Sequence, residues 1–348
     1  MNSFKKYLIH RLKETFLLTL VLCIFAVIVM STFTSLWLGT YFEWIDGYDE
    51  PIEVRRLRIE GFGLIAFIIG AACTLMPVVE LGDMKNKRNA DVIYSLPVSR
   101  GKMAIAHYLS GFIQAAAIFT AAYVTFFIKI VTSRLFSHAE SPGALIGCYF
   151  ALLAAGLAVY SIIMAIFNSA NTVIDGCVFA AVWSFLICAF VIALCELDIN
   201  MDGAIGINSI SDLRVELLMP HGSFGIADFF NDLVVGRAPD TDHVKSVVMW
   251  FIVGIAATAV YYFSFKRKRV EELSDISDTF FGYRVILPIS VFSMTQAFDD
   301  DLLSYIFAIL LGVVGYMIYR RSFKIKRKDI ITVGAIVAAT LLLIMIFG

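Results

Sequence analysis

The chain has 348 residues, of which 59% are hydrophobic and 16% are charged. Soluble domains carry roughly 45–50% apolar and about 25% charged residues, so this composition indicates a membrane protein and excludes an ordinary soluble domain. The net charge of −1 argues against a nucleic acid as a partner.

The N-terminal residues 1–15 predict a helix that lies in the membrane interface before the first span. Phe4, Tyr7 and Leu8 share one face of this helix, and Arg11 is expected on the polar face with the lysines. This pattern is typical of an interfacial elbow helix. An unstructured basic tail is the alternative.

Long apolar segments after residue 15 predict nine membrane crossings. They cover residues 16–39, 62–79, 103–131, 144–167, 172–194, 246–265, 285–298, 302–319 and 330–347. The seventh segment is short for a helix that needs about 20 residues, so both a thin span and a re-entrant segment stay open there. The basic clusters fall on one side of the membrane if the N-terminus is inside, which predicts a multi-pass protein with a cytoplasmic N-terminus.

Two polar stretches are expected on the outer side. Residues 40–60 predict a loop in which acidic side chains compensate three arginines. Residues 196–245 form the longest polar stretch, and its amphipathic pieces 210–219 and 225–235 predict short helices on the outer face.

Residues 82–102 form a basic polar segment between the second and third spans, as expected for a cytoplasmic loop. Its apolar residues predict one side of a short helix that Pro97 ends, and Ser99 is placed to cap the next helix. These apolar residues are Ala90, Val92, Ile93 and Leu96. A rigid helix joined directly to two spans transmits displacement, so a partner protein is expected to act here. A plain inner loop that only sets topology is the alternative.

Motifs for catalysis are missing from the sequence. It contains no phosphate-binding loop, zinc-protease motif, nucleophile elbow or paired Cys/His ligand set, so we expect no enzyme activity, no metal and no cofactor in this chain. The five histidines are scattered and are expected to be solvated or interfacial. The six cysteines are expected to be buried apolar thiols.

Few polar residues fall within or beside the spans. Glu80, Lys129 and Asp175 lie near predicted span ends, where snorkelling or a helix terminus accommodates a charge. Gln114 lies deeper and predicts an interhelical hydrogen bond. A place for Gln114 and Asp175 along a translocation path is the functional alternative. No chain of acids crosses the bilayer, which disfavours a proton-coupled carrier.

The run DVIYSLPVSRGKMAIAHYLSGF at residues 91–112 resembles the loop between spans 2 and 3 of ABC-2-type exporter permeases. The stretch RSFKIKRK at 321–328 is similar to that of bacterial permeases related to the acetoin-utilisation and cell-wall-antibiotic-induced ABC transporters. The resemblance implies an all-α polytopic protein of the bacterial cytoplasmic membrane. It would consist of an elbow helix at 1–15, a six-span core at 16–265 and about three further spans at 266–348.

The resemblance also implies a function and partners. The chain would be the permease subunit of an ABC exporter, paired with a second copy or a similar permease within the lipid bilayer. ATP and Mg²⁺ would bind to a separate ATPase subunit, which docks on a coupling helix in the loop 82–102. The contact residues implied for this sequence are Arg88, Asp91, Tyr94, Ser95, Leu96, Pro97 and Arg100.

Other functional classes stay open. A non-transporting immunity or sensing protein against a peptide antibiotic would act without an ATPase, and a secondary carrier would depend on an ion gradient. An intramembrane enzyme is disfavoured because no catalytic pair shares a span. An apolar bundle rich in alanine and glycine is compatible with amphiphilic substrates such as peptides, antibiotics or lipid-like molecules.

Overall fold

The computed structural model describes residues 3–43, 52–200, 219–268, 271, 273, 275, 277, 279–295, 302–324 and 326–347. Five helices in this part are long and apolar enough to cross a membrane. They are α2 (Phe16–Phe33), α3 (Phe62–Gly82, extended by a short 3₁₀ turn), α5 (Arg100–Val131), α6 (Ala144–Ser169) and α9 (Asp242–Arg267). This is the architecture expected of a largely α-helical membrane protein. The chain divides into two compact units.

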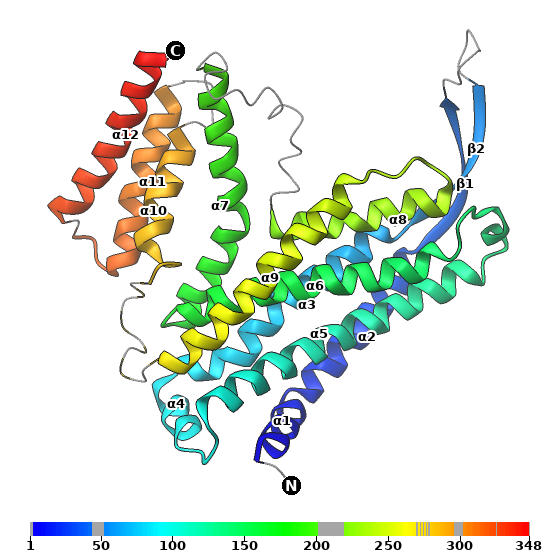
Figure 1. Ribbon diagram of the computed structural model, residues 1–348, viewed down its shortest axis with the longest axis horizontal. Helices are drawn as coiled ribbons and strands as arrows, with labels where there is room; N and C mark the ends of the chain where they lie inside the picture. Colours follow the sequence, from blue (N-terminus) through cyan, green and yellow to red (C-terminus); the bar gives the residue numbers. More distant parts are fainter. Residues whose placement is uncertain are drawn as a thin grey trace. The chain divides into compact units, whose positions relative to one another are not determined.

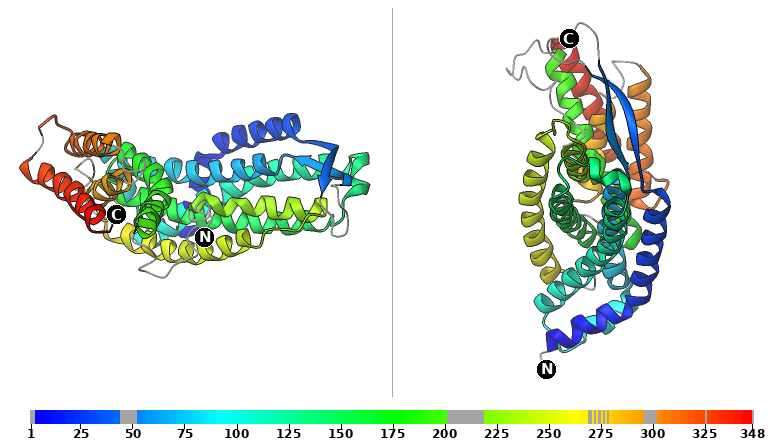
Figure 2. Two further views of the ribbon diagram at one scale, coloured as in Figure 1. Left: turned by 90° about the horizontal axis from the view of Figure 1, so that it is seen from above. Right: turned by 90° about the vertical axis from the view of Figure 1, so that its right-hand side faces the viewer.

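The first unit comprises Met1–Glu80, Pro97–Ile163 and His221–Tyr262. It begins with α1 (Ser3–Glu14), which confirms the helix predicted at the N-terminus. Helices α1 and α2 both pack on α5, and the chain turns between them at Thr15 (Figure 2). The expected polar position of Arg11 is wrong, because this side chain is only 4% exposed and reaches a buried carboxylate.

A β-hairpin occupies the region where the sequence predicts the end of the first span and the external loop 40–60. Helix α2 ends at Phe33, and β1 (Ser35–Glu43) then pairs antiparallel with β2 (Ile52–Glu60) (Figure 1). The cause is an alternation with a period of two: Leu57 and Ile59 are buried, whereas Arg58 between them is exposed. The prediction of a span to residue 39 followed by a plain loop is therefore wrong.

Short helices accompany these elements. They are η2 (Arg134–His138), which contacts both strands, η4 (Pro220–Gly225), whose Phe224 side chain lies against Gly70 of α3, and α8 (Ile226–Val235), which packs on β2. Helix α8 ends at Gly236, whose φ of 78° is the left-handed conformation that glycine adopts readily. The second predicted amphipathic helix, 225–235, is thus confirmed. The first, 210–219, lies outside the described residues except for Met219.

The core of the first unit depends on close approach of α5, α6 and α9. Gly254 in α9 lies against the backbone of α6, where an added Cβ would lie 2.7 Å from Ala158 Cα. The Tyr261 hydroxyl of α9 donates to the Ala104 carbonyl of α5 at 3.1 Å. Small residues and interhelical hydrogen bonds are what hold helices together in a membrane.

The second unit comprises Leu81–Leu96, Met164–Pro220 and Phe263–Gly348. Its elements are η1 (Asp83–Lys85), α4 (Lys87–Tyr94), α7 (Val173–Asn200), α10 (Tyr283–Thr295), α11 (Leu302–Arg320) and α12 (Arg327–Phe347). Helix α10 packs against α7, α11 and α12 (Figure 1). Its 13 residues extend about 20 Å, less than the roughly 30 Å of a bilayer core. The described part of the short seventh segment is therefore a core helix among three longer ones.

Candidate functional site

The polar segment 82–102 contains one short helix, α4. The Asn86 side chain caps it by accepting a hydrogen bond from the Arg88 amide at 3.1 Å. The helix ends at Tyr94, three residues before Pro97, so its end is earlier than predicted. Ser99 occupies the N-cap position of α5, but its side chain makes no capping hydrogen bond. The N-cap position predicted for Ser99 is therefore confirmed without a side-chain hydrogen bond, whereas the Asn86 side chain caps α4.

Most of the residues implied to contact an ATPase are exposed. Tyr94 is partly buried, and the six exposed residues are Arg88, Asp91, Ser95, Leu96, Pro97 and Arg100. Only Ala90 of the four predicted apolar residues is buried, while Val92 and Leu96 are 64% and 38% exposed. The predicted apolar side is therefore largely exposed, and Leu96 lies beyond the end of α4. The helix presents Val92 among the exposed charged side chains of Arg88 and Asp91.

Lys85 anchors the start of this segment within the second unit. Its side chain is buried and donates to the carbonyls of Asn168, at 3.1 Å, and Ala170. Lys268 donates to the same two carbonyls. These carbonyls lie at the C-terminal end of α6, where the helix dipole favours cations. Two lysine side chains therefore hold the turn that joins α6 to α7.

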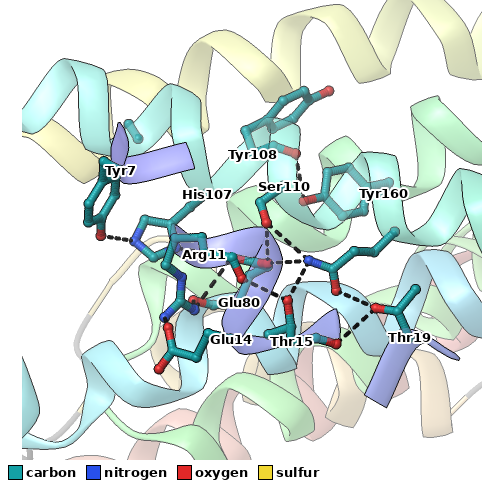
Figure 3. Close-up of polar contacts among 12 residues, drawn as sticks. Tyr7, Arg11, Glu14, Thr15, Thr19, Glu80, His107, Tyr108, Ser110 and Tyr160 are labelled. Carbon is teal, nitrogen blue, oxygen red and sulfur yellow. Dashed lines mark hydrogen bonds and ion pairs between the residues drawn. The ribbon is translucent and has the colours of Figure 1, made fainter. Parts of the chain in front are cut away.

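A cluster of buried polar side chains surrounds Glu80, the last residue before the second unit begins; we call it the Glu80 cluster (Figure 3). Its members are Tyr7, Arg11, Thr15, Thr19, Glu80, His107, Ser110 and Gln114. Glu80 Oε1 accepts from Ser110 Oγ at 2.8 Å and from Gln114 Nε2 at 3.0 Å. Its Oε2 lies 3.5 Å from Arg11 Nη2. The expectation that snorkelling accommodates Glu80 is wrong, because its side chain is fully buried.

His107 extends the cluster toward α1. Its Nδ1 lies 3.2 Å from Glu80 Oε2, and its Nε2 lies 2.9 Å from the Tyr7 hydroxyl. Because a carboxylate only accepts, Nδ1 of His107 carries a proton that it donates to Glu80. The prediction of a solvated or interfacial histidine is wrong for His107, whose side chain is 0% exposed.

Gln114 connects the cluster to α2. Its Nε2 donates to Thr15 Oγ1 at 2.7 Å, and its Oε1 accepts from Thr19 Oγ1 at 2.9 Å. The predicted interhelical hydrogen bond is thereby confirmed. The cluster thus joins α1, α2, α3 and α5, including the helices that lead into and out of the polar segment.

A glycine makes room for the Glu80 carboxylate. A Cβ added at Gly111 would lie 2.9 Å from Glu80 Cγ and would also overlap the Tyr160 hydroxyl. Tyr160 in turn donates to the Tyr108 carbonyl at 3.0 Å (Figure 3). Only a residue without a side chain permits α5 to pass this close to Glu80.

Asp175 forms a separate cluster near the start of α7, in the second unit. Its carboxylate accepts from Ser277 Oγ at 2.8 Å and from the Tyr283 hydroxyl at 3.1 Å, and it lies 3.3 Å from Arg321 Nη2. These contacts tie α7 to α10 and to the segment after α11. For Asp175, as for Gln114, a place on a translocation path stays a prediction.

The described residues also include possible metal ligands and four of the six thiols. No group of three or more His, Cys, Asp or Glu side chains that could hold a metal occurs among them. Cys73 and Cys148 are buried as predicted, but Cys177 is exposed, contrary to the expectation for all six thiols.

Comparison with protein-family models, with curated proteins and with solved structures gave no match. The function proposed below is therefore inferred from the residues of the chain itself.

Proposed function

We propose that this chain is the membrane-spanning permease subunit of an ABC exporter in a bacterial cytoplasmic membrane. A separate ATPase would bind ATP and Mg²⁺ and dock on α4 and the residues that follow it. The chain would work as a pair with a second copy or a related permease, and the elbow helix α1 would lie in the membrane interface.

One observation carries this proposal: a capped helix with exposed apolar and charged residues is followed by SLPVSR, the run that resembles the coupling loop of ABC-2 permeases. The Glu80 cluster adds support, because it binds α3 and α5 to each other and to α1 close to the point where the polar segment begins. Displacement of the segment would then act on several helices together rather than on one loop.

Cysteine cross-linking tests the docking. The chain is produced with the proteins encoded beside it and purified in mild detergent, with exposed Cys177 replaced by Ala. Cysteines placed at Arg88 or Asp91 are expected to cross-link to a co-purifying ATPase, whereas a cysteine at exposed Ser137 in η2 is expected not to. A chain that purifies without any ATPase contradicts the proposal.

Substitution tests the coupling. Pro97→Ala with Arg100→Ala is expected to abolish most transport and to leave the thermal unfolding midpoint unchanged, since both side chains are exposed. Full transport by this variant rules out the coupling role. Protection against an antibiotic without any ATPase would instead support an immunity or sensing protein, and dependence on an ion gradient would support a secondary carrier.

A further inference from the structure

An apolar groove runs between α11 and α12 within the second unit. It encloses ≈ 340 Å³, and its lining includes Ile309, Val313, Tyr316, Val333 and Gly334. A Cβ added at Gly334 would meet no atom within 4 Å, so the groove is open at this point. A volume of this size is at the lower end of the range for small-molecule sites, and it suits a narrow apolar group.

Asp329 is the charged residue that lines the groove, at the end nearest the start of α12, and the segment that precedes it is strongly basic. The segment from the end of α11 to the start of α12 carries six cations, which are Arg320, Arg321, Lys324, Lys326, Arg327 and Lys328. Arg320 pairs with Asp329, at 2.5 and 2.6 Å, and Arg321 pairs with Asp175. The other four are exposed, and no ion pair joins them to any residue in the described part of the chain.

Asp329, the acidic residue at this end of the groove, forms an ion pair with Arg320 and therefore does not repel a bound anion. The hydrogen bonds from Arg320 lower the pKa of Asp329, so its negative charge is matched by that guanidinium. The surplus of positive charge is carried by the four exposed side chains. Phe323 lies among them and is 91% exposed, as expected for a residue that enters the membrane interface.

We infer that this groove binds one acyl chain of an anionic phospholipid, with the phosphate of the lipid beside Arg327 and Lys328. The apolar lining would contact the acyl chain of the lipid, and the side chains of Arg327 and Lys328 would bind its phosphate. A zwitterionic lipid would leave the surplus charge uncompensated, so an anionic headgroup is selected. This site does not depend on the proposed transport function.

Lipid retention by the purified full-length chain tests the site. The chain in mild detergent is mixed with phosphatidylglycerol or with phosphatidylcholine that has identical acyl chains, and native mass spectrometry measures the lipid that stays bound. Phosphatidylglycerol is expected to be retained in preference. Arg327→Gln with Lys328→Gln should reduce its retention about tenfold or more, since each cation near a headgroup contributes measurably to binding.

A second variant tests the groove separately. Gly334→Leu adds a side chain at a position where a Cβ meets no atom within 4 Å, and it is expected to reduce phosphatidylglycerol retention to a similar extent. Two controls match these changes. Lys5→Gln with Lys6→Gln removes the same charge from exposed positions in α1. Ala335→Leu ends in the same side chain at an exposed position of α12 outside the groove lining, and neither control should alter retention.

Three results would overturn the inference. Equal retention of the two lipids by the unmodified chain excludes selection by charge. Unchanged retention in Gly334→Leu excludes the groove. Conversion of a dimer to a monomer by Gly334→Leu, with lipid retention unchanged, assigns the groove to a second copy of the chain. None of these measurements involves an ATPase, so their failure is distinct from a failure of the transport proposal.

Discussion

Two of the three buried carboxylates among the described residues, Glu80 and Asp175, are held in different ways. The side chain of Glu80 is fully buried, and its carboxylate contacts an arginine of α1 and accepts hydrogen bonds from side chains of α5. Asp175 lies near the start of a helix, and its cation Arg321 is 48% exposed. An ion pair that reaches water contributes little, whereas removal of one partner from a buried pair leaves an uncompensated charge. The same substitution should therefore cost more at Glu80 than at Asp175.

Glu80→Ala is expected to have the largest effect. It leaves the guanidinium of Arg11 buried without its carboxylate and removes the acceptor of Ser110 and Gln114, so the free energy of unfolding should fall by about 3–5 kcal/mol. Thermal unfolding in mild detergent, followed by circular dichroism, measures the change. Glu80→Gln keeps an acceptor oxygen and should lose less. An unchanged midpoint in Glu80→Ala would show that the cluster does not stabilise the bundle.

Gly111→Ala tests whether the close packing of α5 against Glu80 requires a glycine at this position. The new methyl group would lie 2.9 Å from Glu80 Cγ, so the free energy of unfolding should fall by about 1–3 kcal/mol as the neighbours shift. Gly82→Ala is the matched control, because its Cβ would meet nothing within 4 Å. The control should be neutral or slightly stabilising, since alanine favours a helix by up to about 1 kcal/mol over glycine. Equal effects of the two substitutions would contradict the steric argument.

Asp175→Asn is expected to have a smaller effect in the second unit. The amide oxygen can still accept a hydrogen bond from Ser277 or Tyr283, and the lost pair with half-exposed Arg321 contributes about 0–1 kcal/mol. The same unfolding measurement applies. A loss as large as that in Glu80→Gln, the matching change from carboxylate to amide, would remove the distinction drawn between the two carboxylates.

His221 offers a test by pH in the first unit, outside the spans. Its Nε2 lies 3.1 Å from Thr74 Oγ1, and burial lowers the pKa of its imidazole below the usual value of about 6.5. Between these two pKa values the unfolded chain binds more protons than the folded one. The contribution of His221 to stability is therefore complete above about pH 6.5 and is lost as the pH falls.

The unfolding midpoint should accordingly fall between about pH 7.5 and about pH 5.5, which brackets the titration of histidine. The fall should be smaller in His221→Gln, which cannot be protonated. His138→Gln, at a position where the side chain is exposed, is the control and should behave like the unmodified chain. The same pH dependence in all three proteins would exclude a contribution from His221.

The long apolar helices could be predicted from the sequence because hydrophobic length is a local property. The segment predicted at 144–167 is close to α6, and the hydrogen bond of Gln114 could be predicted because a buried amide needs a partner. The hairpin was missed because its alternation is short and follows a long apolar run. Leu57 and Ile59, with Arg58 between them, carried that signal.

The Glu80 cluster could be predicted only in part. His107, Ser110 and Gln114 are spaced by three and four residues, which places them on one face of α5 and signals a polar stripe in an apolar helix. Which carboxylate that stripe meets depends on how α3 and α1 pack against α5. Arg11 was misplaced for the same reason, since a charged residue on an amphipathic helix normally faces water.

The turn after α6 has a consequence for how this sequence can diverge. Lys85 and Lys268 donate hydrogen bonds to the same two carbonyls, so either lysine alone can satisfy them. Two cations this close together also repel each other. Loss of one lysine relieves that repulsion and leaves the turn held. Descendants of this sequence should therefore tolerate replacement of either lysine, whereas lineages that have lost both should be rare.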